Sequence, residues 1–85
     1  MRLTNDSYLV TLRFTSGTEY YFRDGAKWTK VTTRGHRMTA TAEQVMNHLL
    51  PALAGAKPGV AVTVVHRDLD ESAAETLDQL RSDAR

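Results

Sequence analysis

The sequence has no cysteine and no isoleucine, and it has only two prolines among 85 residues. Without cysteine the chain can form no disulfide, no thiolate metal site and no thiol nucleophile, which fits a reducing compartment. The missing isoleucine and the excess of arginine over lysine indicate a coding genome rich in G and C, and we take the source to be a bacterium or a phage.

Long apolar segments are also missing. No run approaches the roughly 20 residues that a membrane helix needs, and residues 1–6 lack the apolar core of a secretory signal. We therefore expect a soluble, cytoplasmic protein with no membrane partner. A chain of 85 residues suits a single domain over 1–85, with 1–6 frayed. Because so short a chain buries a limited share of its surface, we also expect it to self-associate as a homodimer.

The hydrophobic pattern changes period along the chain. Alternating or β-branched segments predict strands, and apolar residues three and four apart predict helices. Strands are predicted at 7–14, 19–23, 26–34 and 60–66, and helices at 41–50 and about 69–80. The resulting class is α+β in the order β-β-β-α-β-α: a three-stranded antiparallel meander, a helix, a fourth strand and an acidic C-terminal helix.

The fourth predicted strand, residues 60–66, is apolar on both faces, which is typical of a central strand covered on both sides. A right-handed crossover through the first helix would place this strand parallel to the first strand and beside it.

Both helices carry start signals. Thr41 and Gln44 match a capping box, and Asp68 or Asp70 can cap the second helix. Pro51 predicts that the first helix stops near Leu50, because proline removes a backbone donor. The predicted apolar stripes are Ala42, Val45, Met46, Leu49, Leu50 and Leu53 in the first helix, and Leu69, Ala73, Leu77 and Leu80 in the thinner second one.

Hairpin turns predict which residues face each other. An Asp24-Gly25 turn would place Tyr21 opposite Trp28. For the first hairpin, a three-residue loop keeps the apolar residues together by placing Phe14 opposite Tyr20. The inner face would then hold Tyr8, Val10, Leu12, Phe14, Tyr20, Phe22 and Val31. The outer face would hold a row of Arg13, Tyr21 and Trp28, flanked by Arg23, Lys30 and Arg34.

Charge is divided along the chain. Residues 1–67 carry nine Lys/Arg and four Asp/Glu, a balance of +5, whereas residues 68–85 carry two and six, a balance of −4. A charged surface needs a counter-charge from the chain or from a partner. One interpretation is that the acidic C-terminal helix covers the basic outer face, within one chain or exchanged between two.

Two other interpretations leave the outer face to a partner. Tryptophan, tyrosine and arginine are enriched at protein-binding hot spots, so Arg13, Tyr21, Arg23, Trp28, Lys30 and Arg34 are the candidate partner-binding residues. The function expected is a small protein-interaction module, such as a phage or bacterial accessory protein that binds a host or cellular protein. The alternative is nucleic-acid binding through stacked bases, against which the net charge of +1 and the acidic tail argue.

Catalytic patterns are weak. His36, His48 and His66 are isolated in the sequence, and residues four away from His48 offer no second metal ligand. The acids at 68–71 lack the glycine and spacing of a calcium loop. No phosphate loop or nucleophile elbow is present. The sequence therefore predicts no enzyme activity, no metal and no cofactor.

Overall fold

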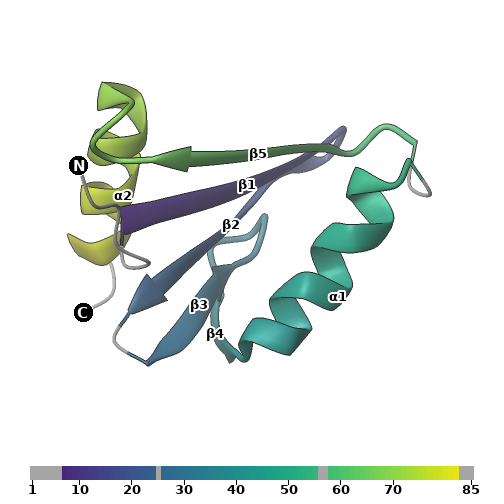
Figure 1. Cartoon of the computed structure of the whole chain (residues 1–85), viewed down its shortest axis with the longest axis horizontal. Coiled ribbons are helices and arrows are strands. Elements are labelled where there is room, and N and C mark those ends of the chain that lie inside the picture. The colour runs from purple at the N-terminus through teal and green to yellow at the C-terminus, as the bar shows by residue number, and fades with distance from the viewer. Residues whose placement is uncertain (1–6, 25, 56–57, 83–85) are drawn as a thin grey trace.

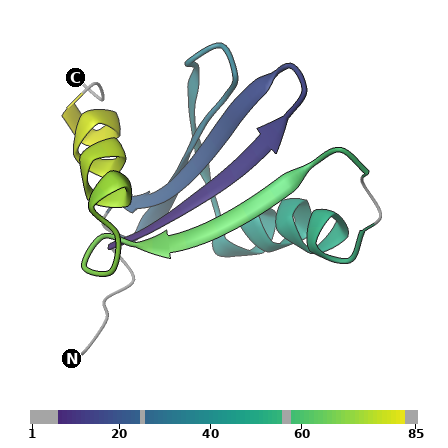
Figure 2. The same ribbon diagram turned by 90° about the horizontal axis from the view of Figure 1, so that it is seen from above.

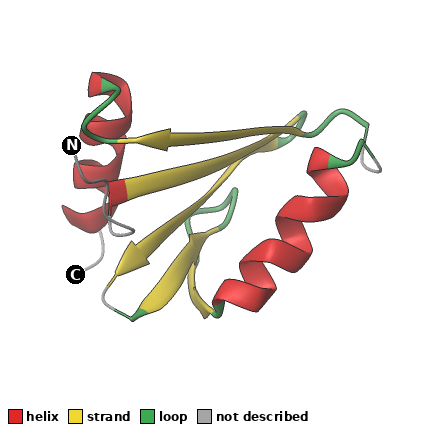
Figure 3. Ribbon diagram, in the orientation of Figure 1, coloured by secondary structure: helices red, strands yellow, loops and turns green. Residues whose placement is uncertain are grey.

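The alternating segment at the start of the chain forms the first strand of a five-stranded antiparallel sheet in the computed structural model, which describes residues 7–24, 26–55 and 58–82 (Figures 1 and 3). In chain order the elements are β1 (Tyr8–Phe14), β2 (Gly17–Asp24), β3 (Lys27–Val31), β4 (Arg37–Ala40), α1 (Ala42–Leu53), β5 (Ala61–His66) and α2 (Glu71–Ser82). The strand order across the sheet is β4-β3-β2-β1-β5. The predicted α+β class is confirmed, with one strand more than predicted.

The additional strand is β4, which the sequence pattern did not reveal. Residues 26–34 were predicted as one strand, but β3 ends at Val31 and the chain turns back as Arg37–Ala40. This reversal sets the direction of the elements that follow. Because β4 runs back along β3, helix α1 starts at the other end of the sheet from the one predicted. The strand β5 therefore runs antiparallel to β1. The predicted position beside β1 is correct, and the predicted parallel direction is wrong.

β5 is an edge strand, not the central strand predicted from its apolar character. Val62 packs with the core that contains α1 and Val65 with the core that contains α2, whereas Val64 is exposed. The apolar composition of residues 60–66 therefore reflects partial cover on both faces of an edge strand.

Both predicted hairpin registers are wrong. In the first hairpin Phe14 pairs with Gly17 and Leu12 with Glu19, around a two-residue loop. In the second hairpin Asp24 pairs with Lys27, so Asp24 belongs to the strand, while Gly25 lies outside the described residues. These registers place Leu9 on the same face as Phe22, and Val10 on the same face as Tyr21.

The sheet has two cores, one under each helix. We call the two sides the α1 face and the α2 face. Val10, Leu12, Tyr21 and Ala40 pack with Val45 and Leu49 on the α1 face, while Leu9, Phe22 and Val31 pack with Ala73, Leu77 and Leu80 on the α2 face. Seen from above, the two helices lie on opposite sides of the sheet (Figure 2). The single inner face predicted from the sequence is thus divided between two faces.

The start of α1 is as predicted, and its end is not. The Thr41 side chain accepts from the Gln44 backbone, and the Gln44 side chain accepts from the Thr41 backbone, which completes the capping box. The helix continues through Pro51 to Leu53. Only part of its predicted stripe is covered by the sheet: Val45 and Leu49 are buried, whereas Met46, Leu50 and Leu53 are exposed.

Asp70 is the cap of α2, because its Oδ1 accepts from the Ala73 backbone at 3.1 Å. Leu69, predicted in the apolar stripe, lies before the helix and is exposed. The Arg67 guanidinium pairs with Asp78 at 3.1 Å, and Arg37 donates to the Leu80 carbonyl at 2.7 Å. The acidic helix does cover a sheet face, but it covers the one with Phe22 and not the one with Tyr21 and Trp28.

The connection from β5 to α2 is fixed by a buried histidine. His66 Nδ1 accepts from the Asp68 backbone at 3.1 Å, and the imidazole edge packs on the Tyr8 ring with centroids 4.9 Å apart. Neither helix of the described chain is long and apolar enough to cross a membrane.

The α2 core generates a stability prediction. Leu77 is 0% exposed and Leu69 is 69% exposed. Truncating Leu77 leaves a cavity under α2, so Leu77→Ala should lower the free energy of unfolding by about 2–5 kcal/mol. The matched change Leu69→Ala should alter it by less than about 0.5 kcal/mol. Urea denaturation followed by circular dichroism measures both. Equal effects would contradict the packing of α2 described above.

Candidate functional site

Three side chains form a row across the α1 face. Tyr21 on β2 pairs with Lys30 on β3, and Lys30 pairs with Met38 on β4. Antiparallel partners point to the same face, so the three side chains are neighbours. The two residues at the ends differ in burial, because Tyr21 is 3% exposed and Met38 is 54% exposed. The row therefore runs from the core to the surface.

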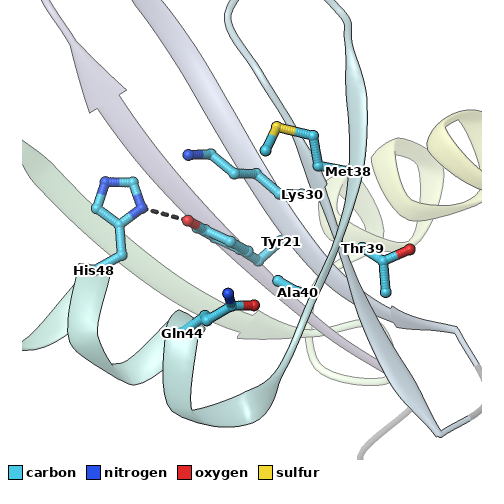
Figure 4. Close-up of a pocket in the computed structure, with 7 residues that line it drawn as sticks. All are labelled: Tyr21, Lys30, Met38, Thr39, Ala40, Gln44 and His48. Carbon is cyan, nitrogen blue, oxygen red and sulfur yellow. Dashed lines mark hydrogen bonds between the residues drawn. The ribbon is translucent and has the colours of Figure 1, made fainter.

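Helix α1 supplies the opposite wall. Gln44 and His48 are four residues apart and lie on one flank of the helix, turned toward the row. Between helix and sheet lies an open pocket of about 280 Å³. Its lining consists of Tyr21, Lys30, Met38, Thr39, Ala40, Gln44 and His48, drawn in Figure 4.

A polar network closes the inner end of the pocket. The Tyr21 hydroxyl and His48 Nδ1 are hydrogen-bonded (Figure 4). His48 Nε2 lies 3.9 Å from one carboxylate oxygen of Glu19, and Lys30 Nζ lies 3.8 Å from the other. Lys30 also sits 5.8 Å from the centre of the Tyr21 ring, within range of a cation–π contact. Two strands, β2 and β3, and the helix α1 thus meet in a network of four side chains.

Burial raises the pKa of Tyr21 from 10.0 to about 12, and the negative charge of Glu19 adds to the shift. Both effects disfavour the phenolate. At neutral pH the hydroxyl therefore keeps its proton and stays hydrogen-bonded to His48 Nδ1.

This arrangement provides fixed hydrogen-bonding groups. A phenol with a pKa near 12 is a poor acid and a poor nucleophile near neutral pH. General acid–base catalysis needs a group whose pKa lies close to the working pH. Tyr21 instead orients His48, and Glu19 holds Lys30 in place. The pocket thus combines a flexible apolar rim at Met38 with polar atoms inside.

The structure brings together only part of the predicted site. Tyr21 and Lys30 line the pocket. Trp28 is partly buried at the margin of the same core, opposite Arg23 across the hairpin. Arg13 is exposed and lines a hollow on the α2 face, and Arg34 is exposed in the turn between β3 and β4. The predicted row of Arg13, Tyr21 and Trp28 is not formed, because Arg13 lies on the α2 face, whereas Tyr21 and Trp28 remain on the α1 face.

The sequence did not reveal several residues of this region. Glu19 was not among the candidate residues, and Met38, Thr39 and Ala40 lie on the unpredicted strand β4. His48 was examined only as a metal ligand, and Gln44 only as part of the capping box. For Gln44 and His48 the available signal was their spacing in the helix. A histidine one helical turn after a glutamine indicates a polar flank beside the apolar stripe.

Within the described residues, no group of three or more His, Cys, Asp or Glu side chains is placed to hold a metal ion. Comparisons with protein-family models, with curated proteins and with solved structures found no match. The site must therefore be interpreted from its own chemistry.

The raised pKa of Tyr21 can be tested by removing the charge of Glu19. Glu19→Gln keeps the shape of the side chain and removes one cause of the shift, so the pKa should fall from about 12 toward 10. Ultraviolet absorbance of phenolate against pH measures it, with Tyr21→Phe identifying the step that belongs to this residue. Glu43→Gln on the exposed start of α1 is the control. An equal shift in both variants would contradict the network.

The same shift predicts the alkaline stability of the fold. Because the pKa of Tyr21 is higher in the folded protein than in the unfolded chain, its contribution to stability is complete below pH 10 and is lost as the pH rises to about 12. Tyr21→Phe lacks the hydroxyl, so it should be less stable at pH 8 by about 1 kcal/mol. Its free energy of unfolding should then fall less steeply from pH 10 to 12. Parallel curves for both proteins would contradict the prediction.

Proposed function

We propose that this protein is a small, non-enzymatic protein-interaction module that receives a side chain of its partner in the pocket between α1, β3 and β4. The observation that carries the proposal is the combination of an exposed methionine at the rim with ordered polar groups inside. A hot spot of a protein interface commonly consists of such an anchor pocket, in which an inserted side chain is fully desolvated.

The size of the pocket supports a side chain as its occupant. Sites for whole small molecules commonly span about 300–1,000 Å³, and this open pocket has about 280 Å³. Met38 can adapt to the shape of a partner because its side chain is unbranched and polarisable. Gln44 and Thr39, both exposed, provide donors and acceptors around the opening. An apolar or aromatic side chain that carries one polar atom would satisfy both parts of the lining.

We infer the biological setting of the protein from the composition of its sequence. A phage or bacterial accessory protein that binds a host or cellular protein in the cytoplasm suits a short chain without cysteine. Arg13, Arg23, Trp28 and Arg34 then lie outside the pocket, where they can contribute only to the periphery of a larger interface.

Nucleic-acid binding, the alternative function, is less well supported by the geometry. It depended on Tyr21 and Trp28 presenting open ring faces beside Arg13. Tyr21 is buried under α1 and Arg13 is on the other face of the sheet. A base cannot stack on a ring that a helix already covers.

Met38→Lys provides the test, because it places a charge at the rim without disturbing the core. Affinity capture from bacterial lysate, quantified by mass spectrometry, should yield a partner whose recovery falls at least tenfold with this variant. The purified partner should show the same loss in its Kd. Leu69→Lys, also exposed but remote in the fold, should bind like the wild type. A partner that both variants bind equally does not use the pocket, and salt-sensitive retention of oligonucleotides alone would favour the alternative.

A further inference from the structure

The strand β5 leaves a row of backbone groups open to solvent. It is the last strand of the described sheet, paired with β1 on one side only. The Arg67 backbone donates to the Ser7 carbonyl at 2.9 Å. In an antiparallel ladder hydrogen-bonding residues alternate, so the odd residues of β5 bond to β1, and the N–H and C=O groups of Val62 and Val64 point outward.

This edge lacks the usual protection against pairing. Natural edge strands are commonly shortened or carry lysine, proline or an inward-pointing charge. Residues 60–66 contain no Lys, Arg, Asp, Glu or Pro. The edge at β4 differs, because that strand has four residues and begins with Arg37. The unprotected edge of the sheet is therefore β5.

An uncovered apolar flank of α1 lies beside the same edge. Met46, Leu50 and Leu53 are 48%, 51% and 60% exposed and recur at helical spacing. They occupy the flank opposite Gln44 and His48, which face β3 and β4. The exposed flank is thus turned toward the β5 side of the sheet. Val64, 52% exposed, points to the same face by alternation with the packed Val62.

We propose that the edge of β5 and this flank of α1 together bind a second copy of the chain. The two β5 strands pair antiparallel about a two-fold axis at Thr63, so that Val62 of one copy hydrogen-bonds with Val64 of the partner subunit. The axis is perpendicular to the joined ten-stranded sheet. It therefore keeps both α1 helices on one face, antiparallel, with their apolar flanks toward each other.

A second copy suits this surface better than an extended peptide. A peptide added to β5 would satisfy the open backbone hydrogen-bonding groups of the strand but would leave Met46 and Leu50 in water. A second copy brings both a strand edge and an apolar helix flank, in the same relative positions as in the first copy. Symmetry also places like residues near each other at the axis, and like charges there would repel. The strand and the flank between Met46 and Leu53 carry no charged side chain, so no repulsion opposes the pairing.

The available area approaches that of a small specific interface. The exposed parts of Met46, Leu50, Leu53 and Val64 amount to roughly 350–400 Å² of mostly apolar surface in each copy, the size of the largest patch on a typical monomer. The edges of the two strands add to this area and bring it toward the lower bound of about 1,200 Å² for specific interfaces. The inference goes beyond the proposed function, because it needs no other protein and uses the opposite flank of α1.

A single introduced cysteine tests the position of the axis, since the chain has none of its own. Thr63 would face the partner subunit's Thr63 as a non-hydrogen-bonded pair, whose short Cβ separation permits a disulfide. Mild oxidation of Thr63→Cys should therefore give a covalent dimer at micromolar concentration. Thr39→Cys, on the exposed β4 edge, is the matched control. Equal or faster linkage of Thr39→Cys would overturn the proposal.

The second measurement needs no cysteine and compares two methionines of similar exposure. Sedimentation equilibrium of the full chain should give a dimer for the wild type and for Met38→Lys, and at least a tenfold weaker dimer for Met46→Lys. A wild-type monomer at 200 μM, or equal Kd values for both variants, would overturn the proposal. Circular dichroism verifies that each variant is folded. Because Met38→Lys tests the pocket and Met46→Lys tests the dimer, either proposal can fail while the other stands.

Discussion

The fold depends on the burial of two consecutive residues of β2 on opposite faces of one sheet. Tyr21 is 3% exposed and Phe22 is 1% exposed. Side chains alternate along a strand, so no single layer can cover both rings. Each ring therefore needs its own helix: α1 covers Tyr21 and α2 covers Phe22. The two helices are not interchangeable supports, because removing either one would expose a large aromatic ring.

This two-sided burial explains which predictions from the sequence were right. The local signals were reliable, since the Thr41–Gln44 capping box and the Asp70 cap depend only on residues within one turn. The register failed because it was chosen to place all apolar residues on one face. In a sheet with two cores the short loop is better, because it pairs Leu9 with Phe22 on one face and Val10 with Tyr21 on the other. The strand β4 was missed because the alternation of Arg37–Ala40 covers only four residues, which is too short to stand out in the pattern.

The candidate site was only half predictable, for the same reason. Aromatic and basic character drew attention to Tyr21 and Lys30, and both line the pocket. Their partners Glu19 and His48 are brought to Tyr21 by the register and by the packing of α1, and His48 lies 27 residues away in the chain. No local pattern encodes such a contact. Once Leu12 pairs with Glu19, however, the carboxylate must lie on the α1 face, and a buried acid needs the positive or donor groups that Lys30 and His48 supply.

The width of the apolar surface on α1 connects the pocket with the open strand. A helix on a sheet needs an apolar stripe of about 100°, and Val45, Leu49 and Ala52 already fill that role. Met46, Leu50 and Leu53 widen the stripe on one side only, while His48 and Gln44 make the other side polar. The three added side chains remain about half exposed within one chain, and exposed apolar surface favours association. In the proposed dimer this apolar flank would pack against its counterpart in a second copy of the chain, while the polar flank would remain available to the proposed protein partner.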